Sequence, residues 1–156
     1  MTVCTACIGE EPAKGLSKGG PAPQPLPYEV SVTSASTGLR SALRAGEFGF
    51  VLDAGRALGG EQSAASPVQA FIGSIVACTQ ITLQIVAKDA GVQLPTIHWQ
   101  GHGVFDAQRL VSGSNTDPRF QSITVRGKVE GATVDQAQLD ELAGTRCAAT
   151  PLCTAT

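Results

Sequence analysis

Charged residues are scarce in this chain, and no cluster of one sign stands out. Asp, Glu, Lys and Arg together make up 15% of the 156 residues, and the formal net charge at pH 7 is −2. No basic patch with interleaved aromatic residues occurs, which argues against a nucleic-acid-binding surface. A surface with so few charges also indicates that part of it is buried against another subunit.

The cysteine count argues against a disulfide framework. Five cysteines form an odd set, and a chain of this length buries enough surface without covalent cross-links. The first residues also lack the basic start and apolar run of a secretory signal. We therefore expect free thiols in a reducing, cytoplasmic setting. The five are Cys4, Cys7, Cys78, Cys147 and Cys153.

The longest uncharged segment, residues 68–87, is long enough to cross a bilayer. Polar side chains are scattered around it, however, and neither basic clusters nor interfacial aromatic residues flank it. Ser66 and Pro67 form an N-cap and a first helical position, and Gly91 suits a helix end. The pattern predicts a long helix buried in a soluble domain, with no membrane contact.

The rest of the chain predicts an α+β domain with a flexible arm. Residues 1–27 are rich in Gly and Pro and read as a flexible arm, and residues 28–156 as one domain. Apolar alternation and turn signals predict antiparallel strands, and residues 135–147 repeat leucines as an amphipathic helix does. Strands are expected at 28–33, 39–43, 47–52, 96–105 and 120–130, with a hairpin at Ala45-Gly46, a glycine-rich loop at 53–65 and turns at 110–119.

Cys78, midway along the long helix, has two interpretations. Free cysteine is among the most buried residue types, so Cys78 is either an inert core residue or the centre of the chemistry. The CxxC of Cys4 and Cys7 offers two zinc ligands rather than four, so incidental thiols are the favoured reading there. His98 and His102 share a strand face without further ligands. We expect no metal and no cofactor.

Several segments, taken in order, resemble the OsmC/Ohr family of osmotically inducible and organic-hydroperoxide-resistance proteins. The resemblance covers roughly residue 39 to the end. A Gly-Gly loop that leads into Ser-Pro, and then a helix with Ala-Cys before a threonine, is fairly specific for that family. The segments that carry it are FVLDAGRALGGEQSAASPVQAFIGSIVACTQITL, AKDAGVQL, RFQSITVRGKVEG and VDQAQLDELAGTRCAATPL.

The resemblance implies an intertwined homodimer with antiparallel sheets packed on the central cysteine helix. In peroxidase members of the family, a thiolate on this helix attacks the peroxide, a second cysteine resolves the product, and a dithiol restores the pair. Cys78 matches the attacking position. Cys147 or Cys153 would resolve it, and Arg40 or Arg44 would activate it.

Two positions differ from the family pattern. Val68 occupies the place of the family's carboxylate, and Thr150 rather than cysteine precedes Pro151. The leading hypothesis is a peroxidase for organic hydroperoxides, with Cys78, Cys147 and Arg40 as its site. The alternative is a non-enzymatic module that binds an apolar ligand at the dimer interface. A third hypothesis is redox or metal sensing by Cys4 and Cys7.

Overall fold

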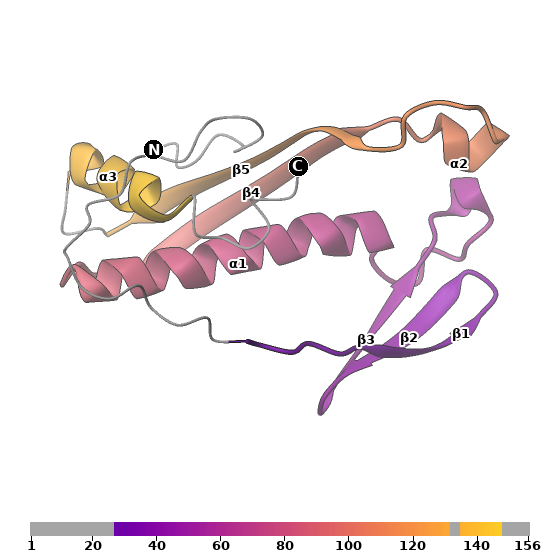
Figure 1. Cartoon of the computed structure of the whole chain (residues 1–156), viewed down its shortest axis with the longest axis horizontal. Coiled ribbons are helices and arrows are strands. Elements are labelled where there is room, and N and C mark those ends of the chain that lie inside the picture. Colours follow the sequence, from indigo (N-terminus) through magenta and orange to yellow (C-terminus); the bar gives the residue numbers. More distant parts are fainter. Residues whose placement is uncertain (1–26, 132–134, 148–156) are drawn as a thin grey trace. The chain divides into compact units, whose positions relative to one another are not determined.

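The computed structural model describes residues 27–131 and 135–147, and it confirms the α+β class. The chain divides into two compact units at Ala70–Phe71. The first described unit holds a three-stranded sheet and the loop that leads into the long helix α1. The second holds the rest of α1, a two-stranded sheet and the remaining helices (Figure 1).

The three-stranded sheet is antiparallel, in the order β1 (Thr33–Thr37), β2 (Arg40–Ala45) and β3 (Phe48–Asp53). The predicted hairpin at Ala45-Gly46 is confirmed, with Gly46 at φ 59°. The predicted strand at 28–33 is wrong, because only Thr33 of that range is in a strand. Thr33 pairs with Arg44, and β2 turns back one residue later, so residues 28–32 run beyond the strand that pairs β1.

A loop of residues 54–66 joins β3 to α1 and contains one turn of 3₁₀ helix, η1 (Arg56–Leu58). Backbone hydrogen bonds close it at both ends, from Asp53 N to Ala65 O at 3.1 Å and from Ala54 N to Leu39 O at 3.3 Å. A β-carbon at Gly60 would lie 2.1 Å from the Ala54 oxygen. This close approach requires glycine, which explains one member of the Gly-Gly pair.

The long helix α1 spans Pro67–Asp89, as the sequence predicts. The Ser66 Oγ accepts a hydrogen bond from Gln69 N at 3.2 Å, and Ser66 N donates to Gln69 Oε1 at 2.8 Å. This reciprocal pair is a capping box, which satisfies backbone groups that the first turn leaves unpaired. At the other end Gly91 takes the left-handed conformation, φ 71°, after Lys88 and Asp89.

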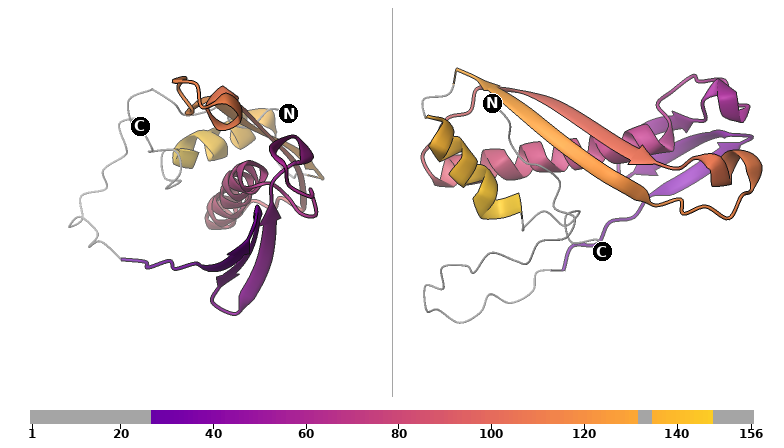
Figure 2. Two further views of the ribbon diagram at one scale, coloured as in Figure 1. Left: turned by 90° about the vertical axis from the view of Figure 1, so that its right-hand side faces the viewer. Right: turned by 90° about the horizontal axis from the view of Figure 1, so that it is seen from above.

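The two-stranded sheet pairs β4 (Thr96–Phe105) with β5 (Phe120–Glu130) in antiparallel register, so both predicted strands are confirmed. The expected turn-rich connection contains a short helix, α2 (Gln108–Ser112). The sheet runs along α1 in every view (Figure 2).

The close approach of α1 to β4 depends on two glycines. A β-carbon at Gly101 would lie 2.7 Å from Ile72 Cγ2 and 2.8 Å from Val76 Cγ2, and one at Gly103 would lie 2.8 Å from Ile72 Cδ1. These distances are shorter than any ordinary contact between carbon atoms. Gly101 and Gly103 therefore allow the helix and the strand to approach more closely than any larger residue would permit.

The buried core lies where the C-terminal half of α1 meets the two-stranded sheet and α3 (Gln136–Cys147). The predicted amphipathic character of α3 is confirmed at Leu139, which is 1% exposed, and at Leu142, which packs against the cluster. Asp135 precedes α3, and its Oδ1 accepts a hydrogen bond from Gln138 N at 3.0 Å. The buried cluster consists of Leu83, Ala87, Leu94, Val129 and Leu139.

We predict that Gly101→Ala destabilises the fold, because the new methyl group overlaps Ile72 and Val76. The expected cost is about 1–3 kcal/mol in the free energy of unfolding, measured by urea denaturation. Gly55→Ala is the control: no atom lies within 4 Å of its added β-carbon, and its φ of −66° suits alanine. Equal stability of the wild type and Gly101→Ala would contradict this packing.

Candidate functional site

Cys78 is a free thiol in the middle of α1, and it is half-buried. It does not belong to the buried core cluster, whose α1 members are Leu83 and Ala87. The residues of α1 that pack closest on β4, Ile72 and Val76, lie about 120° and 160° around the helix from it. Cys78 is therefore turned away from β4, and it is not among the fully buried residues of the core.

The face of α1 that carries Cys78 is apolar and only partly covered: Phe71 stacks on Phe120 of β5, with ring centroids 5.5 Å apart, whereas two isoleucines further along are at least half exposed. Phe71, Ile81 and Ile85 are 40%, 60% and 50% exposed. With 100° per residue, all three lie within about 60° of Cys78 around the axis. Exposed aliphatic side chains that gather on one helix face mark a contact surface more strongly than the same residues scattered singly.

Among the described residues, α1 is the one helix long and apolar enough to cross a membrane, and 22% of its most apolar window is buried. Core helices of soluble proteins pass the same test of length and composition. The sequence predicts a buried helix, whereas the single chain covers only one side of it.

The start of α1 holds no ionisable group. Val68 is half-buried, and the Gln69 side chain is used in the capping box with Ser66. The resemblance described above expects a carboxylate here, and the sequence has Val68 in its place. The structure gives Gln69 a role in starting the helix, about 13 Å along the axis from Cys78.

Arg40 lies opposite a buried carboxylate, a pairing that the sequence interpretation missed. Arg40 pairs directly with Asp53 across β2 and β3, and Asp53 is 2% exposed. Ser63 donates to Asp53 Oδ2 from both its N–H and its hydroxyl, each at 2.9 Å. The Ser63 backbone N–H, its hydroxyl, the Ala54 N–H and the charge of Arg40 together lower the pKa of Asp53 despite its burial.

One sequence signal could have identified Asp53. It is a charged residue at the end of the apolar strand FGFVLD, directly before the glycine-rich loop. A carboxylate in that place is well situated to bind the loop's backbone N–H groups. The pairing with Arg40 depends on the strand register, which composition does not reveal.

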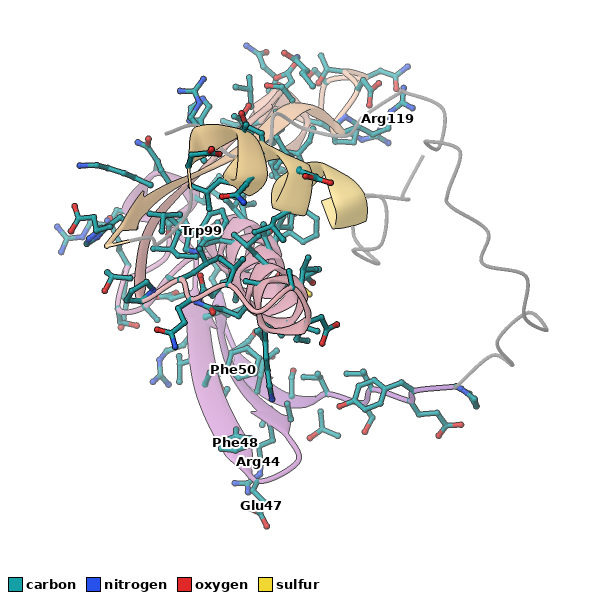
Figure 3. The ribbon with its side chains drawn as sticks, turned by 90° about the vertical axis from the view of Figure 1, so that its left-hand side faces the viewer. Arg44, Glu47, Phe48, Phe50, Trp99 and Arg119 are labelled. Atoms are coloured by element: carbon teal, nitrogen blue, oxygen red, sulfur yellow. The ribbon has the colours of Figure 1, made fainter. Side chains whose placement is uncertain are left out.

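Arg44, the second candidate activator, has a different environment. Its cross-strand partners are Gly49 on β3 and Thr33 on β1, neither of which carries a charge. It lies near the end of the β2–β3 hairpin, close to Glu47 and Phe48 (Figure 3). Arg40 and Arg44 are both exposed and lie on the same face of their sheet.

The structure describes only part of the surroundings of the cysteines that could resolve Cys78. Cys147 is the last residue of α3, and its side chain lies outside the described part of the chain. Cys4, Cys7 and Cys153 also lie outside the described residues, as do Thr150 and Pro151. The pairing of Cys78 with Cys147 therefore stays a prediction.

The histidines lie on the outward face of the two-stranded sheet. His98 Nε2 is 3.4 Å from Glu130 Oε2, and Lys128 Nζ is 3.5 Å from Glu130 Oε1. His98 first and Lys128 second lower the pKa of Glu130. All three side chains are more than half exposed, so these ion pairs contribute little to stability. Residues 27–131 and 135–147 contain no group of three acidic, histidine or cysteine side chains placed to hold a metal.

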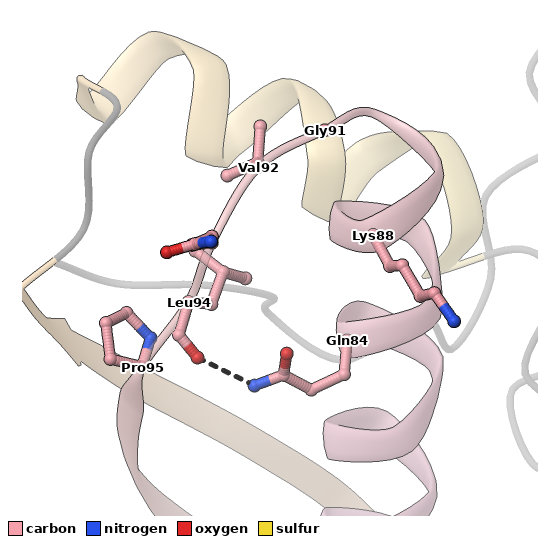
Figure 4. A pocket seen from close by; sticks show the side chains of 7 residues that line it. Gln84, Lys88, Gly91, Val92, Leu94 and Pro95 are labelled. Carbon is pink, nitrogen blue, oxygen red and sulfur yellow. Dashed lines mark hydrogen bonds between the residues drawn. The ribbon is translucent and has the colours of Figure 1, made fainter.

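A shallow groove lies at the C-terminal end of α1, away from Cys78 (Figure 4). Gln84 Nε2 donates to the Leu94 carbonyl at 2.9 Å across it. Lys88, at its rim, is ten residues beyond Cys78, or about 15 Å along the helix. The groove is therefore not a pocket for the thiol. Its lining residues are Gln84, Lys88, Gly91, Val92, Gln93, Leu94 and Pro95.

These elements define an α+β protein with a cysteine on a long helix that runs along an antiparallel sheet. The family profile described as OsmC-like protein matches residues 60–150, which is more than half of the chain. The chain belongs to the OsmC-like protein family. The resemblance found in the sequence is therefore confirmed.

Solved structures show the same fold. The OsmC like protein from Mycoplasma pneumoniae is 13% identical over 82% of this chain and 86% of that chain, with a TM-score of 0.67. An organic hydroperoxide resistance protein OsmC from Legionella pneumophila is 20% identical, covering 80% and 85%, at 0.58. The organic hydroperoxide resistance protein OhrB of Bacillus subtilis is 20% identical, covering 81% and 88%, at 0.54. A search of curated protein sequences found no match.

We predict that Asp53→Asn weakens the fold at neutral pH and makes acid unfolding less steep. The pKa of Asp53 is below its ordinary value of 3.8 in the folded chain, so ionisation favours folding. This contribution is complete above pH 3.8 and is lost as the pH falls through the lower folded value.

The measurement is the urea midpoint of each variant from pH 7 to pH 2. The wild type and Asp53→Asn are expected to differ at pH 7 and to converge at the acid end. Ser63→Ala, which removes one of the two donors to Asp53 Oδ2, is expected to lie between them. A difference between wild type and Asp53→Asn that does not change with pH would show that Asp53 acts by packing alone.

Proposed function

We propose that this protein is a thiol-dependent peroxidase that reduces organic hydroperoxides in the cytoplasm. One observation carries the proposal: Cys78 lies half-buried on the apolar face of α1, outside the core cluster. Membership of the OsmC-like family and structural likeness to two organic hydroperoxide resistance proteins support it. An apolar surface around the sulfur suits the organic part of a hydroperoxide better than hydrogen peroxide.

The reaction begins with the Cys78 thiolate, which attacks the outer oxygen of the hydroperoxide. A sulfur–oxygen bond forms, the oxygen–oxygen bond breaks, and the organic fragment leaves as an alcohol after it takes a proton. Cys78 becomes a sulfenic acid. The Cys147 thiol then attacks that sulfur, water leaves, and a disulfide forms. A dithiol reductant exchanges with the disulfide and restores both thiols.

Arg40 is the better candidate to stabilise the Cys78 thiolate. A cation beside a cysteine favours the reactive thiolate, and a carboxylate that holds the cation fixes its direction. Arg40 has Asp53 as its direct cross-strand partner, whereas the partners of Arg44 are uncharged. In the family pattern a carboxylate at the position of Val68 orients the cation. In this proposal Asp53 takes over that role.

The protein is proposed to act as a homodimer in which α1 packs against a second copy. Ile81 and Ile85 are at least half exposed, on the same helix face as Cys78. Ser74, about 40° around the axis from Cys78, adds a small side chain to that face, so a second helix can approach closely. Each active site would then be closed from solvent by the partner subunit.

We predict that Cys78→Ser abolishes hydroperoxide consumption, since a serine hydroxyl is not ionised at neutral pH. Purified wild type and Cys78→Ser are mixed with cumene hydroperoxide and a dithiol, and the remaining peroxide is measured over time. The wild type is expected to consume peroxide at least about a hundred-fold faster than the variant. Equal consumption by the two proteins would end the enzyme proposal.

We predict that Ile81→Asp converts the dimer to monomer, because it places a charge at the centre of the apolar face. The measurement is the molar mass from light scattering after size-exclusion chromatography. Gln100→Asp, on the outward face of β4, is the control and is expected to leave the mass unchanged. A wild type that is monomeric at high concentration, or an Ile81→Asp variant with the wild-type dimer mass, would contradict the arrangement.

A second candidate function is a non-enzymatic module that binds an apolar ligand at the dimer interface. Val68, in the place of the family's carboxylate, adds an apolar side chain where a charge would disfavour such a ligand. Native mass spectrometry distinguishes the two functions. A wild type that is inactive toward peroxide and carries a bound apolar molecule would establish this function.

A further inference from the structure

Four side chains of α1, each one turn from the next, follow β4 in the opposite chain direction. Ile72 meets Gly103 and Gly101, and Val76 meets Gly101. Gln80 accepts a hydrogen bond from Trp99 Nε1, and Gln84 bonds to the Leu94 carbonyl before the strand begins. Four helix residues advance about 6.0 Å and two strand residues about 6.6 Å, so the two repeats match from Ile72 to Gln80.

The first two side chains of this row make apolar contacts, and the last two make hydrogen bonds. The contacts of Ile72 and Val76 are aliphatic, and such contacts tolerate small rotations because they are not directional. The bond from Trp99 to Gln80 has a preferred direction and length. The Trp99 ring is itself held in place, because a β-carbon on its cross-strand neighbour Gly127 would lie 2.8 Å from Cζ3. Gln80 therefore meets a donor that has little freedom to move.

Gln80 lies close to Cys78 along the helix but points to the other side. Two residues separate them, which corresponds to about 3 Å along the axis and about 200° around it. A sulfur lies roughly 5 Å from the helix axis, so a rotation of α1 by about 15° displaces it by roughly 1 Å. A displacement of that size costs a reacting group up to about a hundred-fold in rate.

We infer that the hydrogen bond from Trp99 to Gln80 positions Cys78 by fixing the rotation of α1 against β4. Gln80 and Trp99 are positioning residues: Gln80 points away from the thiol on the same helix, and Trp99 lies on the neighbouring strand. This inference rests on the proposed function for its peroxide readout. It assigns a role to the single tryptophan of the chain.

The test uses Gln80→Met, which replaces the amide with an apolar side chain of similar length, and Trp99→Phe, which keeps an aromatic ring without the N–H donor; each removes one partner of the bond. Gln84→Met is the matched control: it removes a side-chain amide on the same row, one turn further from Cys78. Sulfenic acid formation at Cys78 is measured by mass spectrometry after mixing with cumene hydroperoxide. Both test variants are expected to react about ten-fold slower than wild type, and Gln84→Met within two-fold of it.

Gln80→Glu distinguishes positioning from general stability, because its carboxylate oxygen also accepts from Trp99 Nε1. This variant is expected to recover at least half of the wild-type rate. Trp99 emission should shift in Gln80→Met and stay unchanged in Gln84→Met. Equal slowing by Gln80→Met and Gln84→Met, unchanged rates in Gln80→Met, or no recovery in Gln80→Glu would each overturn the inference.

A failure of the proposed function is recognised separately. If wild-type Cys78 forms no sulfenic acid, its alkylation by iodoacetamide is compared in the same variants, since this reaction needs an accessible thiol but no peroxide. A change of at least three-fold in Gln80→Met and Trp99→Phe, absent in Gln84→Met, supports positioning. Equal alkylation in all variants overturns it.

Discussion

The close contact between α1 and β4 is the constraint on which the described C-terminal unit depends. It requires glycine at two positions of the strand, because a β-carbon at Gly101 or Gly103 would overlap the side chain of Ile72. It also determines which side of α1 faces away, and therefore where Cys78 lies. A packing requirement on one face of a helix thus sets the environment of a candidate thiol on the other.

The long helix was readable from the sequence because its signals are local. Ser66-Pro67 and Gly91 mark its ends by hydrogen bonding and backbone conformation, and both act within a few residues. The strands β4 and β5 were readable for the same reason, from alternation over ten residues. The position of β1 could not be predicted in this way. The alternating pattern begins at residue 28, but β1 begins only at Thr33, where β2 offers a partner.

Part of the candidate site can likewise be predicted from local sequence, and part of it cannot. Cys78 and the uncharged start of α1 follow from the sequence, because they depend on identity and order alone. The pairing of Arg40 with Asp53 and the bond between Trp99 and Gln80 do not, since each joins two elements whose relative register no local pattern specifies. The uncharged composition of α1 predicts that the helix is buried, but it does not show which side of the helix remains exposed in a single chain.

The uncovered side of α1 has a consequence for biosynthesis. A newly made chain presents Ile81 and Ile85 to the surrounding solution, together with Phe48, which is 77% exposed. Until another surface covers them, these side chains are open to adventitious association with other nascent polypeptides. In the proposed homodimer a second chain would cover them, so the cellular yield of folded protein would depend on how quickly chains meet, and therefore on the rate of translation.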